Sequence, residues 1–369
     1  MTRIPALDGL RGLAIFLVLC VHFVRAPADG WGAVLGRVAG AGWIGVDLFF
    51  VLSGFLITGI LLDAKGRPGY YRSFYIRRAL RILPLYYGLL AVILLLPRNG
   101  PFAGALGAPY LAEHQGWFWS HTVNWLMVVE GEARLAIQNG FGAIWSLSIE
   151  EQFYLAWPLV VAATSRKGLA RLAIFLVVLA LGLRLALGLR GTPDIVLYSA
   201  TPTRLDPLAI GALLAVLARE GGLQAHRTRY FVAVIASAGA FAVLAVIAQR
   251  MPNANALTFA GVASALALGW GAVMILTTEG TGRWVAAMRS GPMRTLGKYS
   301  YALYLFQAPV DHLLTRFGAG PDVVGRLAYF PLGVGVTFAL AWTSWHFWER
   351  HWLQLSAPHS RPPELLPVP

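Results

Sequence analysis

Arg11 and His22 are two ionisable residues at the ends of one apolar run, in the stretch RGLAIFLVLCVH. On an α-helix of about 100° per residue, their spacing comes within roughly 20° of a whole number of turns and spans about 16 Å. The two side chains therefore share a helical face. If that face turns inward, it joins an anion-binding guanidinium to an imidazole, the usual general base near neutral pH. The alternative is that both groups lie near lipid headgroups and are merely tolerated there.

Two further arginines, Arg78 and Arg81, stand in the stretch YIRRALRILPLYY. Their i, i+3 spacing places them on one face of a helix. Two guanidinium groups in that arrangement suit bidentate binding of phosphate. The alternative is that they only mark the cytoplasmic end of a membrane span, as basic residues commonly do.

Carboxylates and small polar residues occur in two more stretches. WSLSIEEQFYLAWPL holds Ser148, Glu150 and Glu151. A helix dipole favours carboxylates near its N-terminus, but two of them directly before an apolar span exceed what capping needs. GVDLFFVLSGFLIT holds Asp47, and its Gly54 would let another backbone approach closely.

The composition indicates which kind of molecule must position these residues. Hydrophobic residues make up 57% of the chain and charged residues 13%, with a mean hydropathy of +0.62. So little polar surface cannot cover a soluble particle, which indicates an integral membrane protein in a lipid bilayer. The net charge of +13 would suit nucleic acid binding, but the basic residues lie between apolar spans. Nucleic acid is therefore not an expected partner.

Apolar runs of about 20 residues, with a lower limit near 17, mark about ten candidate transmembrane helices. We therefore predict an all-α, polytopic integral membrane protein. The predicted spans are 4–25, 43–63, 79–97, 144–163, 169–190, 205–218, 229–249, 256–277, 298–315 and 327–348.

The basic residues between these spans predict the orientation. One side collects roughly twice as many Lys and Arg as the other, which places both termini in the cytoplasm and the protein in the cell inner membrane. A cleavable signal peptide ending near Ala26-Pro27-Ala28 is the alternative for the first span, and Arg11 inside that span argues against it. We expect one membrane domain over 1–350 and a Pro-rich, disordered cytoplasmic tail over 351–369.

Six stretches taken in order resemble the membrane acyltransferase-3 family: DGLRGLAIFLVLCVH, GVDLFFVLSGFLIT, RRALRILPLYY, WSLSIEEQFYLAWPL, TPTRLDPLAIGALLA and GKYSYALYLFQAP. The resemblance covers about residues 4 to 350. It implies a ten-span helical fold, acyl-CoA as donor, and acyl transfer to sugars of surface polysaccharides or to secondary metabolites. The positions to which it assigns roles are Arg11 with His22, Arg78 with Arg81, Glu150 with Glu151, and Arg204 with Asp206.

One position departs from the family pattern. The family usually reads Tyr-x-x-His-x-Pro in its ninth span, where this chain has YLFQAP with Gln307. Glutamine donates and accepts hydrogen bonds but cannot carry a proton at pH 7. We therefore expect His22 to act alone as the base, with no second histidine of the ninth span beside it.

The expected activity is transfer of an acyl group, acetyl foremost, from acyl-CoA to a hydroxyl of a carbohydrate or small-molecule acceptor, without a metal. His22 would be the general base, assisted by Arg11, Glu150 and Glu151. Phosphates of the donor would lie against Arg78 and Arg81. The remaining polar residues are expected to bind the acceptor or to be structural: Asp47, Ser148, Arg204, Asp206 and Gln307.

Two other classes of protein remain open. A proton-coupled transporter or exporter would use Arg11, His22, Asp47 and Asp311 as a substrate and proton path without covalent chemistry. The chain shows no internal symmetry between two halves, which argues against this class. An intramembrane metal hydrolase would need His22, His114, His121 and His346 as ligands, and no two of these have the i, i+4 ligand spacing.

Overall fold

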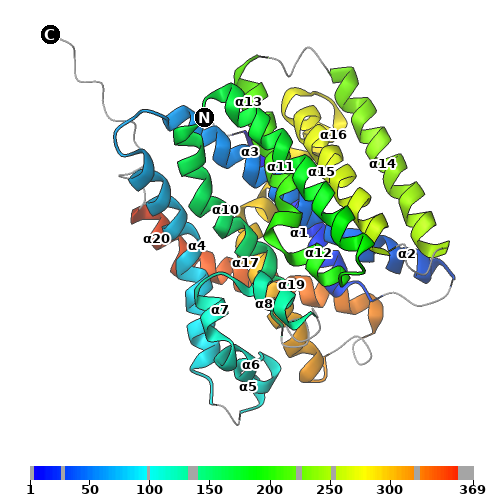
Figure 1. Cartoon of the computed structure of the whole chain (residues 1–369). Helices are drawn as coiled ribbons and strands as arrows, with labels where there is room; N and C mark the ends of the chain where they lie inside the picture. The colour runs from blue at the N-terminus through cyan, green and yellow to red at the C-terminus, as the bar shows by residue number, and fades with distance from the viewer. Residues whose placement is uncertain are drawn as a thin grey trace.

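The computed structural model describes residues 4–25, 30–97, 100–131, 140–221, 227–250, 255–319 and 325–355 (Figure 1). Within these ranges the chain forms helices and no strand. The predicted all-α class is therefore confirmed.

Each of the stretches predicted to span the membrane falls on a helix. These helices are α1 Pro5–Phe23, α3 Ile44–Ala64, α4 Tyr70–Leu94, α10 Ile144–Ala163, α11 Arg166–Leu189, α13 Leu205–Arg219, α14 Arg227–Arg250, α15 Asn255–Glu279, α17 Gly291–Arg316 and α19 Arg326–Ser344. Among the described residues, 5 helical segments are both long and apolar enough to cross a bilayer by length and composition. The protein is thus a polytopic membrane protein, and the count of ten spans stays a prediction.

Helix α4 begins at Tyr70, earlier than the predicted start at 79. The hydropathy reading stops at the charged side chains of Arg72, Arg77 and Arg78, whereas the backbone continues as helix through them. Gly69 precedes the helix at φ 75°, a left-handed conformation that glycine adopts without a steric penalty. As a result Arg78 and Arg81 lie within one helix, which fixes their relative direction.

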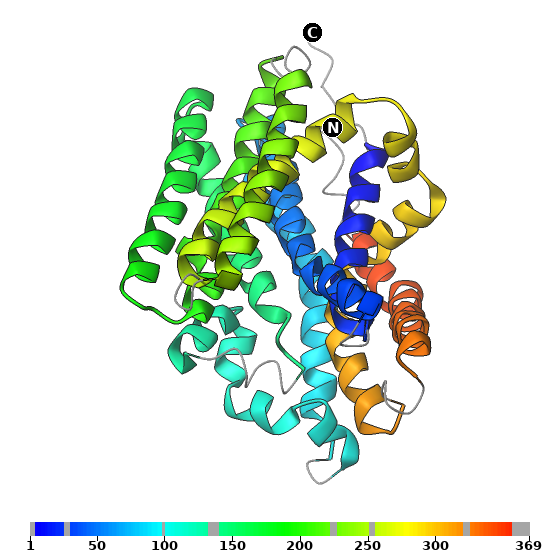
Figure 2. The same ribbon diagram turned by 90° about the vertical axis from the view of Figure 1, so that its right-hand side faces the viewer.

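The stretch between α4 and α10 folds into short helices. They are α5 Pro101–Ala105, α6 Ala108–Glu113, α7 Gln115–Trp119 and α8 Val123–Glu130. Figures 1 and 2 show α5 to α7 at one end of the bundle, opposite the end where α1 begins. No span was predicted between residues 97 and 144, and the described residues there form only short helices.

Besides two 3-10 helices, Ala41–Trp43 and Thr201–Arg204, the described residues form three smaller α-helices, and they end on helix. They are α2 Gly30–Gly40, α12 Asp194–Ser199 and α16 Arg283–Met288. Helix α19 passes through a π-helical turn, Trp345–Glu349, into α20 Arg350–Leu355. The rest of the predicted tail, 356–369, lies outside the described residues, as does the alternative cleavage site at 26–28.

Glycines bring the central helices close together. A Cβ on Gly54 of α3 would lie 2.0 Å from the carbonyl oxygen of Leu208, and one on Gly211 of α13 would lie 2.1 Å from that of Val51. A Cβ on Gly12 of α1 would lie 2.0 Å from the carbonyl oxygen of Met293 of α17. The expectation that Gly54 lets a second backbone approach is confirmed, and the contact at Gly12 sets the neighbouring Arg11 against α17.

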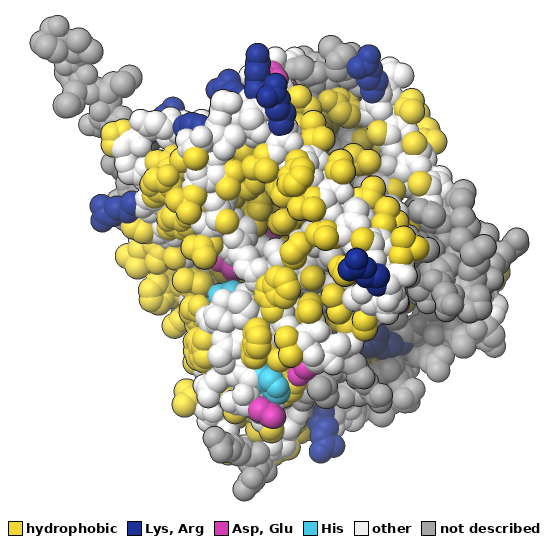
Figure 3. Space-filling view, viewed as in Figure 1, with side chains coloured by type: hydrophobic (Ala, Val, Ile, Leu, Met, Phe, Trp, Pro, Cys, Tyr) yellow, Lys and Arg dark blue, Asp and Glu magenta, His cyan; other side chains and the backbone are white. Residues whose placement is uncertain are grey.

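The outer surface is largely apolar. Hydrophobic side chains cover much of the face seen in Figure 3, while several Lys and Arg side chains gather at its upper end. Large apolar residues remain exposed on the outer helices, among them Leu155, Phe175, Val178 and Phe231. Soluble monomers rarely expose apolar surface on this scale, and a lipid-facing surface explains it.

Candidate active site

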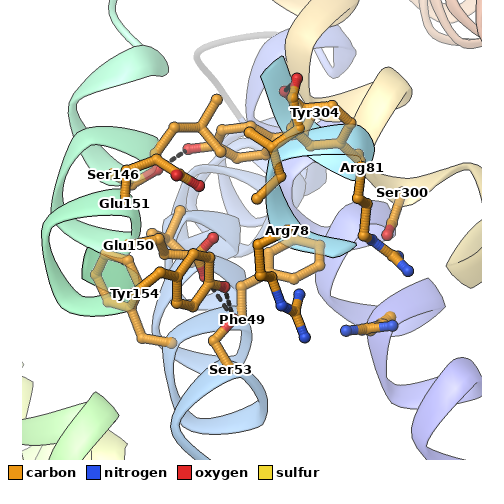
Figure 4. Close-up of a pocket in the computed structure, with 16 residues that line it drawn as sticks. Phe49, Ser53, Arg78, Arg81, Ser146, Glu150, Glu151, Tyr154, Ser300 and Tyr304 are labelled. Atoms are coloured by element: carbon orange, nitrogen blue, oxygen red, sulfur yellow. Dashed lines mark hydrogen bonds between the residues drawn. The ribbon is translucent and has the colours of Figure 1, made fainter. Parts of the chain in front are cut away.

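Five residues that the sequence singled out line one pocket inside the bundle, which we call the central pocket (Figure 4). Arg11 reaches it from α1, Arg78 and Arg81 from α4, and Glu150 and Glu151 from α10. The pocket holds about 80 Å³. Three helices that are distant in sequence thus place three cations and two carboxylates around one small space.

The three arginines have no hydrogen-bonded carboxylate partner in the part of the chain that the structure describes. Among the described residues, no hydrogen bond or ion pair joins Arg11, Arg78 or Arg81 to an acidic side chain. Arg78 lies over the ring of Tyr154, 5.3 Å from its centroid. Figure 4 shows the guanidinium groups of Arg78 and Arg81 on one side of the pocket and Glu151 with Ser146 on the other. Arg11 and Arg78 are partly buried and Arg81 is exposed, so an anion from outside the chain could reach these cations.

Glu150 is held in place by a short chain of hydrogen bonds. Ser53 donates to its Oε1 over 2.7 Å, and Tyr154 donates to Ser53 Oγ over 2.9 Å. The sequence analysis missed both residues. Ser53 adjoins Gly54 and resembles helix packing, while the available signal for Tyr154 was its position one turn after Glu150.

A second cavity, the basic vestibule, adjoins the central pocket. It holds about 580 Å³ and shares Arg11 and Arg81 with the pocket. Arg67, Arg77 and Lys298 add positive charge, against Asp8 and Asp63. Asp63 itself pairs with Arg219 over 2.8 Å, so the vestibule keeps an excess of positive charge.

A third cavity, the aromatic cavity, lies on the other side of the central pocket and shares Val46 and Tyr304 with it. It holds about 320 Å³ and is lined by His22, Trp43, Trp145 and Gln307 among others. Tyr304 bonds Ser146 over 2.6 Å and donates to the carbonyl oxygen of Ala143 over 3.0 Å, which fixes it at the junction. The three cavities therefore follow one another through the bundle.

Arg11 and His22 both face this interior series, as their shared helical face predicts, but they line different cavities. The expectation that the ninth span places no second histidine beside His22 is wrong. His312 lines the same aromatic cavity. The family pattern has its histidine at the position of Gln307, and only that position was considered from the sequence. His312 stands just over a turn later on the same helix.

Asp311, next to His312, is already paired. Arg25 donates to both its carboxylate oxygens over 3.1 Å, and Tyr329 donates to Oδ1 over 2.6 Å. This pairing fixes the end of α17 against α1 and α19.

Three of the predicted polar residues lie in buried ion pairs and line none of these three cavities. Asp47 pairs with Arg204 over 2.7 Å, and both side chains are fully buried. Asp206 accepts two bonds from Arg184, over 2.9 and 2.7 Å, and Arg184 also donates to the carbonyl oxygen of Thr203. The geometry favours the structural reading for Asp47, Arg204 and Asp206, because removing one member of a buried pair leaves the other charge uncompensated.

Aromatic rings surround the first of these pairs. The Arg204 guanidinium lies 5.8, 5.7 and 5.3 Å from the ring centroids of Phe50, Trp145 and Tyr198. Ser148, the remaining predicted polar residue, is buried and donates to the carbonyl oxygen of Ile144 over 3.3 Å. The Ser148 hydroxyl is therefore used within its own helix. Neither Ser148 nor Arg204 lines one of the three cavities.

The described residues thus form a helical membrane bundle with an arginine-lined pocket between two larger cavities. Residues 4–346 match the acyltransferase-3 family, described as an acyltransferase domain. The chain belongs to this family. The match confirms the family that the sequence resembles, with its acyltransferase domain, and gives no support to the transporter alternative.

Named relatives agree with this class. The chain is 29% identical to the peptidoglycan O-acetyltransferase OatA of Listeria monocytogenes, over 94% of this chain and 55% of that protein. It is 30% identical to the putative peptidoglycan O-acetyltransferase YrhL of Bacillus subtilis, over 94% of this chain and 54% of that protein. A putative O-acetyltransferase of Staphylococcus aureus is 28% identical over 92% of the chain. The chain spans about half the length of these relatives, and no solved structure matches it.

Proposed function

We propose that the protein transfers an acyl group, acetyl foremost, from acyl-CoA to a hydroxyl of a bacterial glycan of the peptidoglycan type. The observation that carries this proposal is the series of cavities with three unpaired arginines at its middle. The names of two relatives, a peptidoglycan O-acetyltransferase and a putative one, support the choice of acceptor.

The basic vestibule suits the nucleotide end of the donor. Its volume of about 580 Å³ lies within the usual range of ligand pockets, roughly 300–1,000 Å³. Arg67, Arg77 and Lys298 would meet the phosphates there, with Arg81 at the inner boundary. Charge-assisted bonds from guanidinium groups to phosphate are short and strong, which favours CoA over an uncharged thioester.

The central pocket, with its volume of about 80 Å³, would take only the thioester end of the pantetheine arm. Arg11 and Arg78 line its walls, and an arm passing them would bring the thioester carbonyl towards Tyr304 and the aromatic cavity. We assign His22 the role of general base for the acceptor hydroxyl. As the new C–O ester bond forms and the C–S bond breaks, the hydroxyl proton passes to the imidazole and then to the departing thiolate, so that CoA leaves as the thiol.

Glu150 and Glu151 would orient this exchange from the opposite wall of the central pocket. The bond from Ser53 keeps the Glu150 carboxylate on that wall. A carboxylate there attracts the guanidinium groups across the pocket and so helps to fix their direction. Both residues are therefore assigned to positioning of the donor.

The test uses the purified protein in lipid nanodiscs with acetyl-CoA and fragments of peptidoglycan glycan. We expect thiol release that depends on the glycan, and a mass increase of one acetyl group on the glycan. Thiol release without the mass increase on the glycan would exclude transfer to the glycan. If neither thiol release nor the mass increase is seen, the proposed function is wrong. Flux of glycan across proteoliposomes without thiol release would favour a transporter.

A further inference from the structure

Gln307 is a buried amide without hydrogen-bond partners. Its side chain is 0% exposed, and neither Oε1 nor Nε2 has a partner among the described residues. It is one of the residues that line the aromatic cavity, together with His22. Buried amides in native proteins normally form hydrogen bonds. A buried amide without a partner loses its hydrogen bonds to water and gains none in return, which costs free energy. A ligand group that enters this cavity would supply what the chain does not.

The walls beside Gln307 are aromatic. The rings of Trp145 and Tyr198 lie 4.6 Å apart, and those of Trp43 and Tyr198 meet edge to face at 6.4 Å. All three residues line the cavity. Aromatic faces accept the C–H faces of a ligand, and the few polar groups between them fix its orientation. A pyranose ring presents that combination, with apolar faces and hydroxyl groups around its edge.

We propose that the aromatic cavity is the acceptor subsite, that it takes one pyranose ring, and that Gln307 hydrogen-bonds a ring substituent to set which hydroxyl faces His22. The amide suits this task because Nε2 donates and Oε1 accepts, as adjacent sugar hydroxyls require. This subsite rests on the proposed function, because it names where the acceptor binds. Binding of the sugar can nevertheless be measured without acyl transfer.

The volume of the cavity limits what it can hold. About 320 Å³ lies at the lower end of the range for ligand pockets, roughly 300–1,000 Å³. One sugar ring with its substituents fits this space, whereas a chain of several rings does not. The acceptor glycan would therefore insert a single residue, and a disaccharide should bind almost as well as longer fragments.

The first experiment measures binding of the disaccharide N-acetylglucosaminyl-N-acetylmuramic acid to the full chain in nanodiscs, by calorimetry and by quenching of tryptophan fluorescence. We expect Gln307→Leu to weaken binding by about 10-fold or more, since a site built to bond a hydroxyl loses its partner. Gln307→His, which keeps a donor and an acceptor, should bind close to the parent. Thr337→Val is the matched control, because Thr337 is buried and its hydroxyl donates to the carbonyl oxygen of Gly333 on its own helix.

A second measurement does not depend on the folding of the Gln307 variants. Trp43 lines the cavity, so the disaccharide should quench its fluorescence in the otherwise native chain, and Trp43→Phe should remove that part of the signal. Unchanged quenching in Trp43→Phe places the sugar elsewhere and overturns the subsite. Parental affinity in a folded Gln307→Leu variant overturns the role of the amide.

Transfer assays separate this inference from the proposed function. Acetyl transfer to glycan with parental half-saturation in Gln307→Leu leaves the function standing and overturns the subsite. Disaccharide binding that needs Gln307, without any thiol release from acetyl-CoA, supports the subsite and overturns the transferase. If the disaccharide neither binds nor is acetylated while a non-sugar alcohol is, the sugar subsite is wrong.

Discussion

At the scale of single residues, the unusual feature is that Arg11, Arg78 and Arg81 face one small pocket without an acidic partner among the described residues. Like charges held together inside a membrane protein repel each other, and lipid offers them no counter-ion. Such an arrangement persists where a bound anion relieves the repulsion. In the proposed reaction the donor phosphates meet Arg81 at the boundary with the basic vestibule, which relieves part of this repulsion.

Replacing Arg78 tests the donor site. We expect Arg78→Ala to raise the half-saturating acetyl-CoA concentration by about 10- to 100-fold, because a charge-assisted contact is lost. Arg78→Lys keeps the charge but not the planar fork and should recover part of the loss. Initial rates at varied acetyl-CoA concentration measure the effect. Parental half-saturation in both variants would mean that Arg78 only marks the membrane boundary.

Replacing His22 tests the base. We expect His22→Ala to slow transfer by at least about 100-fold, since a positioned base typically contributes 10²- to 10⁴-fold. Acetyl-CoA binding, measured on the same protein, should stay near the parental value. His312→Ala is the comparison, because His312 lines the same cavity. A larger loss in His312→Ala than in His22→Ala would assign the base to α17 instead of α1.

His121 lies outside the membrane-spanning helices and should make stability depend on pH. Its ring stacks on Tyr86 at 4.2 Å, and burial lowers its pKa from 6.5 to about 4. The unfolded chain then binds a proton that the folded chain does not, so stability falls as pH drops below about 6.5. At pH 5 the loss should reach about 2 kcal/mol.

The phenylalanine variant isolates this contribution. His121→Phe keeps a ring to stack on Tyr86 but cannot titrate. Its thermal unfolding midpoint should change less between pH 7 and pH 5 than that of the parent, measured in the same detergent. Equal pH dependence in both proteins would show that His121 is hydrated in the folded state.

At the scale of helices, glycine contacts hold α3 against α13. We expect Gly211→Ala to destabilise the fold by about 1–3 kcal/mol, because its new Cβ meets backbone that cannot move aside. Gly182→Ala on α11 is the matched control, since a Cβ there meets nothing within 4 Å. The control should be neutral or up to about 1 kcal/mol more stable. Thermal unfolding in detergent compares them, and equal midpoints would contradict the contact.

Local patterns predicted the elements better than their assembly. Hydropathy located the helices, and the periodicity of one helix correctly turned Arg11 and His22 to the same side. Neither pattern contains the information that α1, α4 and α10 meet, because that depends on contacts between distant segments. Ser53 and Tyr304 were missed because uncharged polar residues within an apolar span are indistinguishable from packing until their partners are known.

At the scale of the whole molecule, the orientation predicted from basic residues can be tested with a membrane-impermeant thiol reagent. Cys20 is the single cysteine, so Cys20→Ser gives a background without thiols. Lys167, in the first turn of α11, and Asp194, shortly after its last turn, are both exposed. We expect Lys167→Cys to react only in opened cells and Asp194→Cys to react in intact cells. The reverse pattern would invert the topology, and equal reaction would remove α11 from the spans.

The arginines of the basic vestibule and central pocket have a consequence for how the cell would control such an enzyme. On the proposed reaction they contact the phosphates and pantetheine, which are the same in acyl-CoA and in the CoA that remains after transfer. Binding that does not change along the reaction tightens both ligands equally and cannot expel the product. The rate of glycan modification should then follow the ratio of acyl-CoA to free CoA rather than the acyl-CoA level alone, so that the surface polymer would reflect the carbon supply of the cell.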